Sequence, residues 1–422
     1  MNAFARAIDQ SAEAIPAPAK TVVYVQPTSE VGGSDIALFR LVTHLDRHMY
    51  RPVVVLPRPG PLLPKLEAAS VRVIVLPMMQ LRSIKSLRYW MHFLISFWPT
   101  VFRLAALLRA ERADIVHTNS LFSLYGPWAA LLTRVPHIWH IREIPTVPAL
   151  PQKMAMDTVL RLSARVIAMT DAVAQLFQGA TAGRSKVAVI PDGIDLSAFN
   201  PSVCGNRIRR DLGIGEGAPL IGFVGRLDPW KGADVFLRAA AAIAKHRQDA
   251  HFVVCGGEVA GYESFAASLK GLGHELGLTG RIHFTGWEYR LDDIPEVMAA
   301  LDVLVHTSVR PEPFGLVMVE AMATGTPVVA SLGGGVAEVV KPNVTGLVVK
   351  MGDWSGVAAA VLDLLSNPNR IVEMGKAGRT HAECLFDVAV YVRRVVSLYA
   401  SVLRTDPRPN EAGRTVLAGK VK

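Results

Sequence analysis

Residues 220–244, LIGFVGRLDPWKGADVFLRAAAAIA, decide the fold class of this chain. The apolar run at 220–224 suits a strand that is buried on both faces of a parallel sheet. A glycine-rich loop follows the run, and residues 233–244 then have the apolar spacing of a helix. A strand that enters a helix through such a loop is the repeating unit of doubly wound α/β sheets.

The same unit recurs along the chain in two series. Apolar runs alternate with helical patterns, which favours parallel sheets with right-handed crossovers. The break between the series is expected at 200–217, where Pro201 and four glycines interrupt the pattern. The predicted strands lie at 21–27, 52–56, 71–76, 114–117, 137–141, 166–169, 187–190, 220–224, 251–255, 282–285, 303–306, 328–330 and 347–349.

Two domains that face each other across a cleft follow from these series. We expect Rossmann-like domains at 20–200 and 201–387, and a terminal packing helix at 388–404. The ends, 1–19 and 405–422, are expected to be disordered tails, and the first lacks the apolar core of a secretory signal. Ligands of open parallel sheets bind beyond the carboxyl ends of the strands, so the chemistry should lie on loops that follow strands.

Charge and cysteine content limit the classes of partner. The formal net charge is +9, which attracts anions such as nucleotides, acidic lipids or nucleic acid without choosing among them. The three cysteines, Cys204, Cys255 and Cys384, are far apart and suit neither a disulfide framework nor a zinc site. We expect them to be buried thiols in a cytoplasmic protein.

An apolar stretch, Leu87–Leu108, allows two interpretations. Pro99 and Arg103 interrupt it, and it falls short of the roughly 20 unbroken apolar residues of a transmembrane helix. It could be a buried crossover helix of the first domain. It could also be an interfacial segment at a membrane, because it is rich in aromatic residues and is flanked by cations at 82, 85, 88, 103 and 109.

The loop at 225–232 is the first candidate for a binding site. Its backbone N–H groups lie before a predicted helix, where the positive end of the helix dipole favours an anion. Arg226 and Lys231 add two cations on the same loop, which suits a diphosphate. The loop lacks the Gly-Lys-Ser/Thr ending of a Walker motif, and a surface loop with two solvated cations is the alternative.

The second candidate, EPFGLVMVE at 312–320, follows the predicted strand at 303–306. Glu312 lies before a helix and Glu320 inside it. A carboxylate can accept two hydroxyl hydrogen bonds, as a ribose diol requires. Gly315 lets a ligand approach the backbone, and the N–H groups that follow can receive an anion. Two glutamates at this spacing are commonplace alone, but they gain weight beside the Arg/Lys loop.

Candidates in the first domain carry weaker signals. Gly32 and Gly33 follow the first strand and could approach a phosphate, although a tight turn is the alternative. His140 ends the predicted strand at 137–141, at the edge of the cleft. Acceptor-side candidates follow the same strand or end its neighbour: His117, Asn119, Arg142 and Glu143.

Together these features resemble the retaining glycosyltransferases of family 4, which have the GT-B fold. The resemblance covers about 21–403, and its most specific element is the Glu-X7-Glu motif of Glu312 and Glu320. The stretch Pro191–Asp195 is similar to the family's interdomain Pro-Asn-Gly-Val-Asp turn, with Asp192 in place of asparagine. Residues 333–338 look like its late glycine-rich loop.

The resemblance implies a role for each candidate residue. Arg226 and Lys231 would hold the diphosphate of a nucleotide-sugar donor, and Glu320 would bind its ribose. Glu312 would contact the sugar, with backbone groups from Phe314, Gly315, Leu316 and Val317. Gly33 would approach the phosphate, His140 would lie beside the sugar, and the last helix would cross back onto the first domain.

The expected reaction is transfer of a hexose to a lipid-linked or glycan acceptor, in envelope polysaccharide or glycolipid synthesis. No Asp-X-Asp pair occurs in the sequence, so we expect no metal and no other cofactor. We expect no nucleic acid partner. We expect a cytoplasmic protein, which in the interfacial interpretation of Leu87–Leu108 lies at the inner face of the cytoplasmic membrane. The alternatives are a nucleotide-sugar epimerase or hydrolase of the same fold, and a non-catalytic nucleotide-sugar-binding subunit.

Overall fold

The computed structural model describes residues 18–80, 86–145, 149–180, 183–215 and 217–405. The tails predicted at 1–19 and 405–422 lie outside these ranges, except for Pro18, Ala19 and Thr405. Thr405 closes the last helix, which is one residue longer than predicted.

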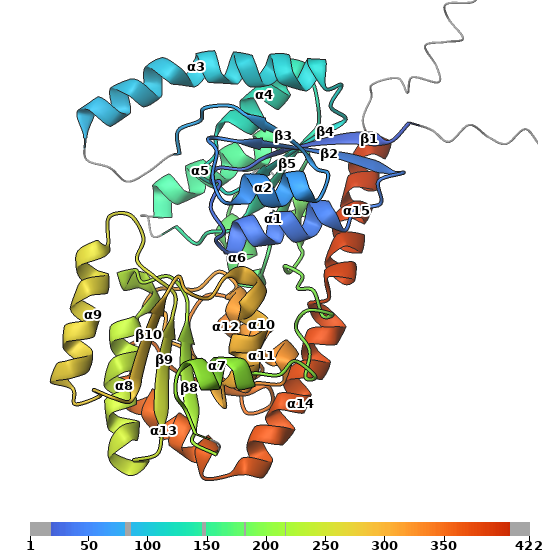
Figure 1. Ribbon diagram of the computed structural model, residues 1–422. Helices are drawn as coiled ribbons and strands as arrows, with labels where there is room; N and C mark the ends of the chain where they lie inside the picture. Colours follow the sequence, from blue (N-terminus) through green and yellow to red (C-terminus); the bar gives the residue numbers. More distant parts are fainter. Residues whose placement is uncertain (1–17, 81–85, 146–148, 181–182, 216, 406–422) are drawn as a thin grey trace, which may run out of the picture.

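The N-terminal half of the chain contains one parallel sheet of seven strands, in the order β3-β2-β1-β4-β5-β6-β7. Its central strands are valine- and isoleucine-rich and almost fully buried, because helices cover both faces (Figure 1). The strands are β1 Lys20–Val25, β2 Tyr50–Leu56, β3 Arg72–Val75, β4 Ile115–Asn119, β5 His137–Ile141, β6 Arg165–Ala168 and β7 Val187–Val189. The helices are α1 Gly33–Thr43, α2 Leu62–Ala68, α3 Leu87–Ala110, α4 Tyr125–Thr133, α5 Ala149–Leu162 and α6 Asp171–Ala174.

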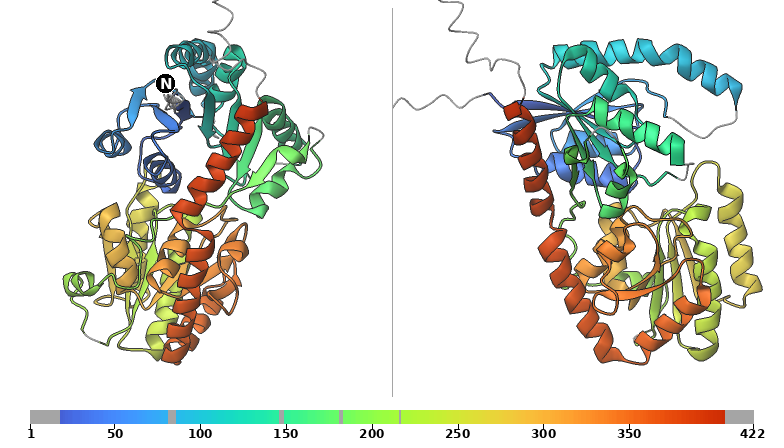
Figure 2. Two further views of the ribbon diagram at one scale, coloured as in Figure 1. Left: turned by 90° about the vertical axis from the view of Figure 1, so that its right-hand side faces the viewer. Right: turned by 180° about the vertical axis from the view of Figure 1, so that it is seen from behind.

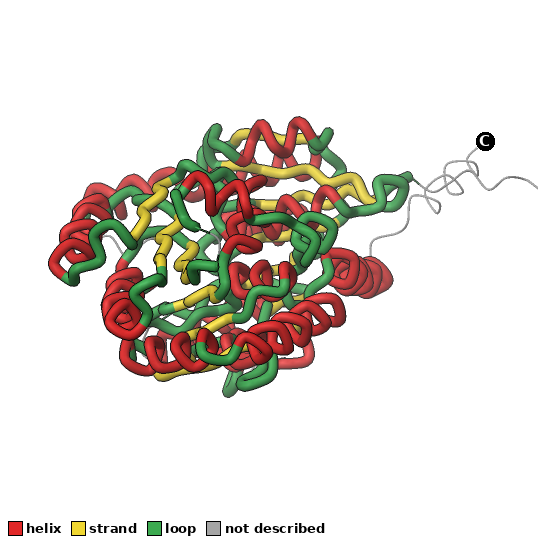
Figure 3. The backbone as a smooth tube through the Cα atoms, turned by 60° about the horizontal axis from the view of Figure 1, so that its bottom comes forward, coloured by secondary structure: helices red, strands yellow, loops and turns green. Residues whose placement is uncertain are grey.

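The C-terminal half contains a second parallel sheet of six strands, in the order β10-β9-β8-β11-β12-β13. Figure 3 shows the strands of both sheets between layers of helices. The strands are β8 Leu220–Val224, β9 His251–Cys255, β10 Ile282–Gly286, β11 Val303–His306, β12 Val328–Leu332 and β13 Gly346–Lys350. The helices are α7 Asn206–Asp211, α8 Ala233–His246, α9 Glu263–Glu275, α10 Ile294–Ala300, α11 Leu316–Thr324, α12 Val336–Val339, α13 Trp354–Leu365, α14 Pro368–Leu385 and α15 Val388–Thr405.

Each predicted apolar run is a strand in this structure, so the predicted α/β class with two parallel sheets is confirmed. The strand order adds what the sequence could not give. In each sheet the direction of winding reverses between two neighbours, β1 and β4 in the first and β8 and β11 in the second. Ligands of such sheets bind at this switch point. The loops that contain Gly33, Arg226 and Glu312 follow β1, β8 and β11, so topology brings them to the two switch points.

The chain crosses between the halves twice. The turn Pro191–Asp195 leaves the first sheet, and its Ile194 exchanges backbone hydrogen bonds of 2.8 and 2.9 Å with Phe386 and Val388. Gly193 is required there, because a Cβ atom would lie 2.6 Å from the Cα atom of Val388. Helix α14 lies along the second sheet, and α15 runs back along the first (Figure 2). The buried residues of α15 belong to the same apolar cluster as residues of β1 and α1.

Helix α3 combines the two interpretations of Leu87–Leu108. One side packs on α4 and buries Phe93, Val101 and Leu104, whereas Leu94 and Ile95 are 67% and 70% exposed. Pro99 lies inside the helix and does not end it. The helix is long and apolar enough to cross a membrane by length and composition, and only a third of its apolar window is buried. It is therefore neither a fully buried crossover helix nor a uniformly exposed one.

The expectation of three buried thiols is wrong for two of them. Cys255 ends β9 and is buried, whereas Cys204 and Cys384 are exposed. All three are free thiols. Cys204 precedes the short helix α7 and Cys384 lies in the last turn of α14, where neither side chain faces the core.

Candidate active site

In the C-terminal half, Glu312 is the centre of a compact polar cluster. Its Oε2 atom accepts hydrogen bonds from Lys231 Nζ at 2.7 Å and Ser308 Oγ at 2.9 Å, and lies 3.2 Å from His306 Nε2. Lys231 ends the loop after β8, and the other two residues lie at or just beyond the end of β11. The parallel pairing of β8 with β11 therefore assembles the cluster from residues that are far apart in the sequence.

The charge of Glu312 is stabilised by its neighbours. The side chain is buried, which by itself would raise its pKa, but the Lys231 ammonium and the His306 hydrogen bond hold the pKa well below its ordinary value. The carboxylate is thus ionised over the physiological range. Neither its protonation state nor its surroundings suit a general acid.

Arg226, the second cation of the loop after β8, lies in a more exposed environment than Lys231. The side chain of Arg226 is 50% exposed, and its Nη2 atom lies 3.2 Å from Asp228. Asp228 is buried, and its carboxylate also accepts a hydrogen bond of 3.2 Å from the backbone N–H of Lys231. Gly232 then takes a φ of +69°, and a Cβ atom there would lie 2.1 Å from the carbonyl oxygen of Thr307. The loop after β8 is thus fixed against the loop after β11.

The start of α11 supplies backbone donors beside this cluster. Gly315 has a φ of +82°, in the left-handed region that favours glycine, and turns the chain from the Glu312 loop into the helix. Leu316 and Val317 form its first turn, where N–H groups have no partner within the helix. Phe314 is buried against Phe386 and anchors the loop to the core. An anion beside Lys231 would meet these N–H groups and the positive end of the helix dipole.

Glu320, one turn further along α11, contacts the opposite half of the molecule. Its Oε1 atom accepts a hydrogen bond of 2.9 Å from Nη2 of Arg40 in α1. Both side chains are only 10% exposed, and Arg40 Nη1 is buried without a partner among the described residues. Burial raises the pKa of Glu320 even though Arg40 opposes the shift. This ion pair joins the two halves directly.

The glycine loop after β1 is held by the buried carboxylate of Asp35. Asp35 accepts hydrogen bonds from Gln26 at 2.7 Å, from Thr28 at 2.6 Å and from the backbone N–H of Gly32 at 3.0 Å. Burial raises the pKa of this carboxyl, and the three donors oppose the rise. A Cβ atom at Gly33 would meet nothing within 4 Å. The described residues therefore leave room at Gly33, where an approaching ligand would explain the need for glycine.

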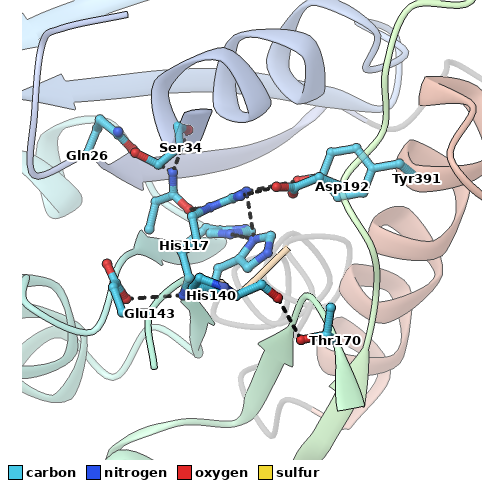
Figure 4. A network of polar contacts seen from close by, with 11 residues as sticks. Gln26, Ser34, His117, His140, Glu143, Thr170, Asp192 and Tyr391 are labelled. Atoms are coloured by element: carbon cyan, nitrogen blue, oxygen red, sulfur yellow. Dashed lines mark hydrogen bonds and ion pairs between the residues drawn. The ribbon is translucent and has the colours of Figure 1, made fainter. Parts of the chain in front are cut away.

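His140 lies within a buried network at the ends of β4 and β5 (Figure 4). Its Nδ1 atom lies 3.3 Å from His117 Nε2 and 3.5 Å from Arg142 Nη2, whereas its Nε2 atom has no partner among the described residues. Burial and the Arg142 charge lower the pKa of His140 well below its usual value, so the ring is neutral. The side chain of His140 is fully buried in this arrangement.

The acceptor-side candidates His117 and Asn119 bond to neighbouring protein groups and do not line a free surface. His117 is bonded on both sides, to His140 and, at 2.7 Å, to Tyr399 of α15. Asn119 donates to Gln26 at 2.7 Å and to the carbonyl of Ser34, and accepts from Arg142. Both side chains are buried and every one of their polar atoms bonds to a protein group, which leaves none for an acceptor.

Arg142 and Glu143 hold the same region together. Arg142 forms a buried ion pair with Asp192 of the interdomain turn. Glu143 accepts hydrogen bonds from the Ser120 hydroxyl and from the backbone N–H groups of Leu121 and Arg142. Burial raises the pKa of Glu143, and these donors oppose the rise. Both side chains thus brace the loops after β4 and β5 against the interdomain turn.

Two further contacts close the molecule around the site. The Thr170 hydroxyl donates to the carbonyl of Pro313 at 2.9 Å. The Glu338 carboxylate accepts from the backbone N–H groups of Asp171 and Ala172 at 2.6 and 2.8 Å, so a C-terminal acid caps the first turn of α6. The late glycine-rich loop therefore serves as a contact between the halves in this arrangement.

Several residues of the site were missed from the sequence. His306 and Ser308 end or follow β11, so the rule that chemistry lies beyond strand ends would have found them. Arg40 and Tyr399 carried no such signal, because each lies on a helix and meets its partner only through tertiary packing.

Comparisons with known proteins agree with this arrangement. Two family models match the chain: Glycosyltransferase Family 4 at residues 31–198 and Glycosyl transferases group 1 at residues 206–381. The chain is 30% identical over 346 residues to a D-inositol 3-phosphate glycosyltransferase of Gordonia bronchialis, which covers 75% of this chain and 74% of the relative. A protein of the same name from Corynebacterium urealyticum is 34% identical over 254 residues, and this match spans 59% of each chain.

Solved structures extend the likeness over both halves. The structure of Anabaena HepE in complex with UDP and glucose has a TM-score of 0.77 and 26% identity, over 90% of this chain and 99% of HepE. A HepE complex with UDP-glucose has a TM-score of 0.78 and 25% identity. Sucrose-phosphate synthase from Thermosynechococcus elongatus, at 22% identity and a TM-score of 0.74, shares the fold.

Proposed function

This chain belongs to glycosyltransferase family 4 and has the GT-B fold, and we propose that it transfers a hexose from a nucleoside-diphosphate sugar to an acceptor with retention of anomeric configuration. The observation that carries the proposal is the cluster of Lys231 and Glu312 beside the start of α11. It provides a cation, a carboxylate and free N–H groups at one switch point. The HepE structures, which contain UDP and UDP-glucose, support a uridine nucleotide as the first donor to test.

The proposed mechanism is electrostatic. Breaking the bond between the sugar and the diphosphate leaves negative charge on the departing group, and Lys231, Arg226 and the first turn of α11 are positioned to stabilise it. One preorganised donor of this kind contributes about 3 kcal/mol to transition-state stabilisation. The acceptor hydroxyl attacks the face from which the diphosphate leaves and passes its proton to the departing diphosphate oxygen, so no enzymatic nucleophile is required. The charge of the diphosphate is met by protein groups, and we propose that no metal takes part.

The carboxylates have separate tasks in this proposal. Glu312 contacts the sugar and shares Lys231 with the diphosphate. Glu320 binds the ribose diol, and its partner Arg40 opposes the rise in the pKa of this carboxyl that burial causes.

The acceptor side is proposed at a cavity of about 210 Å³ beyond the ends of β1, β2 and β3, because His117 and Asn119 are saturated by protein groups. Thr28 and Arg58 line it together with apolar side chains, and Tyr89 from the first turn of α3 forms one wall. The cavity therefore opens between the glycine loop and α3.

A lipid-linked acceptor in envelope polysaccharide or glycolipid synthesis is consistent with the outer face of α3, which we propose rests on the cytoplasmic surface of a membrane. Most of its exposed side chains are apolar, and its charged residues are arginines that are also exposed. Apolar residues flanked by cations suit an interface with anionic lipids. The exposed apolar residues are Leu87, Met91, Leu94, Ile95, Trp98 and Phe102.

The test of the donor site is a screen of UDP- and GDP-sugars for a rise in Tm, followed by product analysis with the donor that binds. A ligand that binds only the folded protein raises its apparent stability. Lys231→Ala and Glu320→Ala should each lower the transfer rate at least about tenfold, since each removes a charged contact to the donor. Wild-type rates in both variants would refute the site.

The same assay separates the alternative functions. A nucleotide-sugar hydrolase or epimerase would consume the donor at the same rate without an acceptor, and a binding subunit would raise its Tm without turnover. Transfer that requires an acceptor would exclude both.

The membrane contact is tested with vesicles of phosphatidylglycerol and of phosphatidylcholine. Replacing Leu94 and Ile95 with serine should weaken sedimentation with the anionic vesicles, because both side chains are exposed and lose their apolar contact. The matched control is Leu131→Ser at the end of α4, a position that is 56% exposed and lies outside α3. Unchanged sedimentation of the α3 variant would refute the contact.

A further inference from the structure

Four buried side chains form a continuous chain of hydrogen bonds that ends at His140. Tyr24 Oη lies 3.0 Å from Tyr399 Oη, which lies 2.7 Å from His117 Nδ1. His117 Nε2 lies 3.3 Å from His140 Nδ1. The four residues come from β1, α15, β4 and β5, so the chain links the C-terminal helix to the end of a strand at the cleft.

Arg142 gives this chain a direction. A guanidinium has donors and no acceptor, and its Nη2 faces His140 Nδ1 at 3.5 Å. His140 Nδ1 therefore accepts, and His117 Nε2–H is the donor that meets it. His117 Nδ1 must then accept from the Tyr399 hydroxyl, whose oxygen accepts from Tyr24.

The protonation states fit this direction. Burial lowers the pKa of His117 to about 3 and that of His140 well below its usual value, with the Arg142 charge adding to both shifts. Burial also raises the pKa of Tyr24 and of Tyr399. Each imidazole therefore holds one proton, and each phenol keeps its own.

The last atom of the chain has no protein partner. His140 Nε2 is fully buried and forms no hydrogen bond within the described residues. Such an atom is rare in a folded protein, because an unpaired polar group loses its hydration without compensation. With Nδ1 as the acceptor, this Nε2 carries the proton of the neutral ring and is a donor without an acceptor.

We propose that Tyr399 and His117, together with Arg142, hold His140 in one tautomer, so that its Nε2–H donates a hydrogen bond to an oxygen of the sugar that is transferred. The inference rests on the proposed function and adds positioning residues to the same site. His140 is then a neutral hydrogen-bond donor, which takes up no proton during the reaction. The C-terminal helix α15 contributes to the site through the Tyr399 hydroxyl and packs on one face of the first sheet beside α1.

The tautomer can be observed directly in the whole protein labelled with ¹⁵N-histidine, with His117→Asn and His140→Gln used to assign the signals. Nitrogen shifts should identify His140 and His117 as Nε2–H tautomers. In Tyr399→Phe, His117 Nδ1 loses its donor, so His117 should populate its second tautomer. The unprotonated His117 Nε2 then faces His140 Nδ1, and part of the His140 population should shift to the second tautomer despite Arg142. An Nδ1–H tautomer of His140 in the wild-type protein, or unchanged shifts in Tyr399→Phe, would overturn the proposal.

Kinetics provide the second measurement. Tyr399→Phe should lower kcat roughly fivefold and change the donor KM less than about twofold, because the sugar loses an orienting hydrogen bond while the diphosphate keeps its contacts with other residues. Tyr24→Phe is the matched control. It removes a buried phenol hydroxyl from the same cluster but leaves the Tyr399 donor in place, so its kcat should stay within about twofold of the wild type.

A double variant separates positioning from general packing. The side-chain amide of His140→Gln cannot tautomerise, so adding Tyr399→Phe to this variant should cause no further loss of kcat. An equal loss in both backgrounds would show that Tyr399 acts through packing and would refute the proposal. The shifts are measured without substrate, so an enzyme that failed to transfer sugar would refute the proposed function and leave the tautomer test standing.

Discussion

Arg142 and Arg226 each pair with an aspartate, but they do so in opposite settings. The Arg142–Asp192 pair lies in the N-terminal half of the site, and both side chains are 4% exposed. The Arg226–Asp228 pair lies in the C-terminal half, where the arginine is 50% exposed. The first arginine is also bonded to Asn119 and lies against His140 and Tyr391, whereas the second has most of its donors free for solvent.

This difference extends to the two halves as a whole. Most polar groups of the N-terminal half of the site pair with one another, with His140 Nε2 among the exceptions, and this pairing fixes their positions before any ligand arrives. In the C-terminal half, Lys231 and Arg226 are paired with carboxylates, but both side chains remain partly exposed to solvent. An anion can therefore bind to them as well. We infer that the first half positions the substrates and that the second half binds the charge of the donor.

The largest expected effect tests the buried pair against the exposed one. Arg142→Met should lower the free energy of unfolding by about 3–5 kcal/mol, because it leaves the Asp192 carboxylate buried without its partner. Arg226→Met should cost no more than about 1 kcal/mol, since exposed pairs contribute little. Denaturant unfolding of both variants measures the difference.

A second substitution checks the cause of that loss. If the unpaired charge is responsible, adding Asp192→Asn to Arg142→Met should recover much of the stability. Equal losses for Arg142→Met and Arg226→Met would break the comparison between the halves.

A smaller effect is expected from pH. Burial lowers the pKa of His137, in β5, to about 3, so this ring stays neutral in the folded protein and charges below about pH 6.5 in the unfolded chain. The unfolded state then binds more protons, and stability falls as the pH drops. This one group should account for about 2 kcal/mol of the loss between pH 7 and pH 5.

The measurement compares the pH dependence of unfolding in the wild type and in His137→Asn, which cannot take up the proton. The C-terminal control is Glu312→Gln. The pKa of Glu312 is well below its ordinary value, so this carboxylate is ionised in both states above about pH 5 and should not change the slope there. A slope unchanged in His137→Asn would contradict the neutral-histidine assignment.

The smallest effect concerns the glycine loop. Gly33→Ala should leave the Tm nearly unchanged, because the added Cβ atom meets nothing within 4 Å and the residue is the first of α1, where alanine is tolerated. It should weaken donor binding by roughly tenfold if a phosphate approaches the backbone there. Calorimetric titration with the nucleotide measures the second quantity.

The matched control for this loop is Gly213→Ala, at a remote turn with a φ of +67°. It should lower the Tm because alanine is strained there, and it should leave donor affinity unchanged. Wild-type affinity in Gly33→Ala would mean that the glycine serves the turn alone.

The sequence by itself determined the parallel α/β class, the positions of the strands and the loops that contain Arg226, Lys231 and Glu312. These features depend on local patterns, such as apolar runs of strand length and glycines before helices, which neighbouring residues suffice to define. The pairings within the site depend on the order of the strands and on how the two halves close. Arg40 meets Glu320 across 280 residues, and His117 meets Tyr399 across 282. Only the tertiary structure could therefore show that His117 and Asn119 are enclosed by protein groups and that the ribose-side glutamate already has a partner.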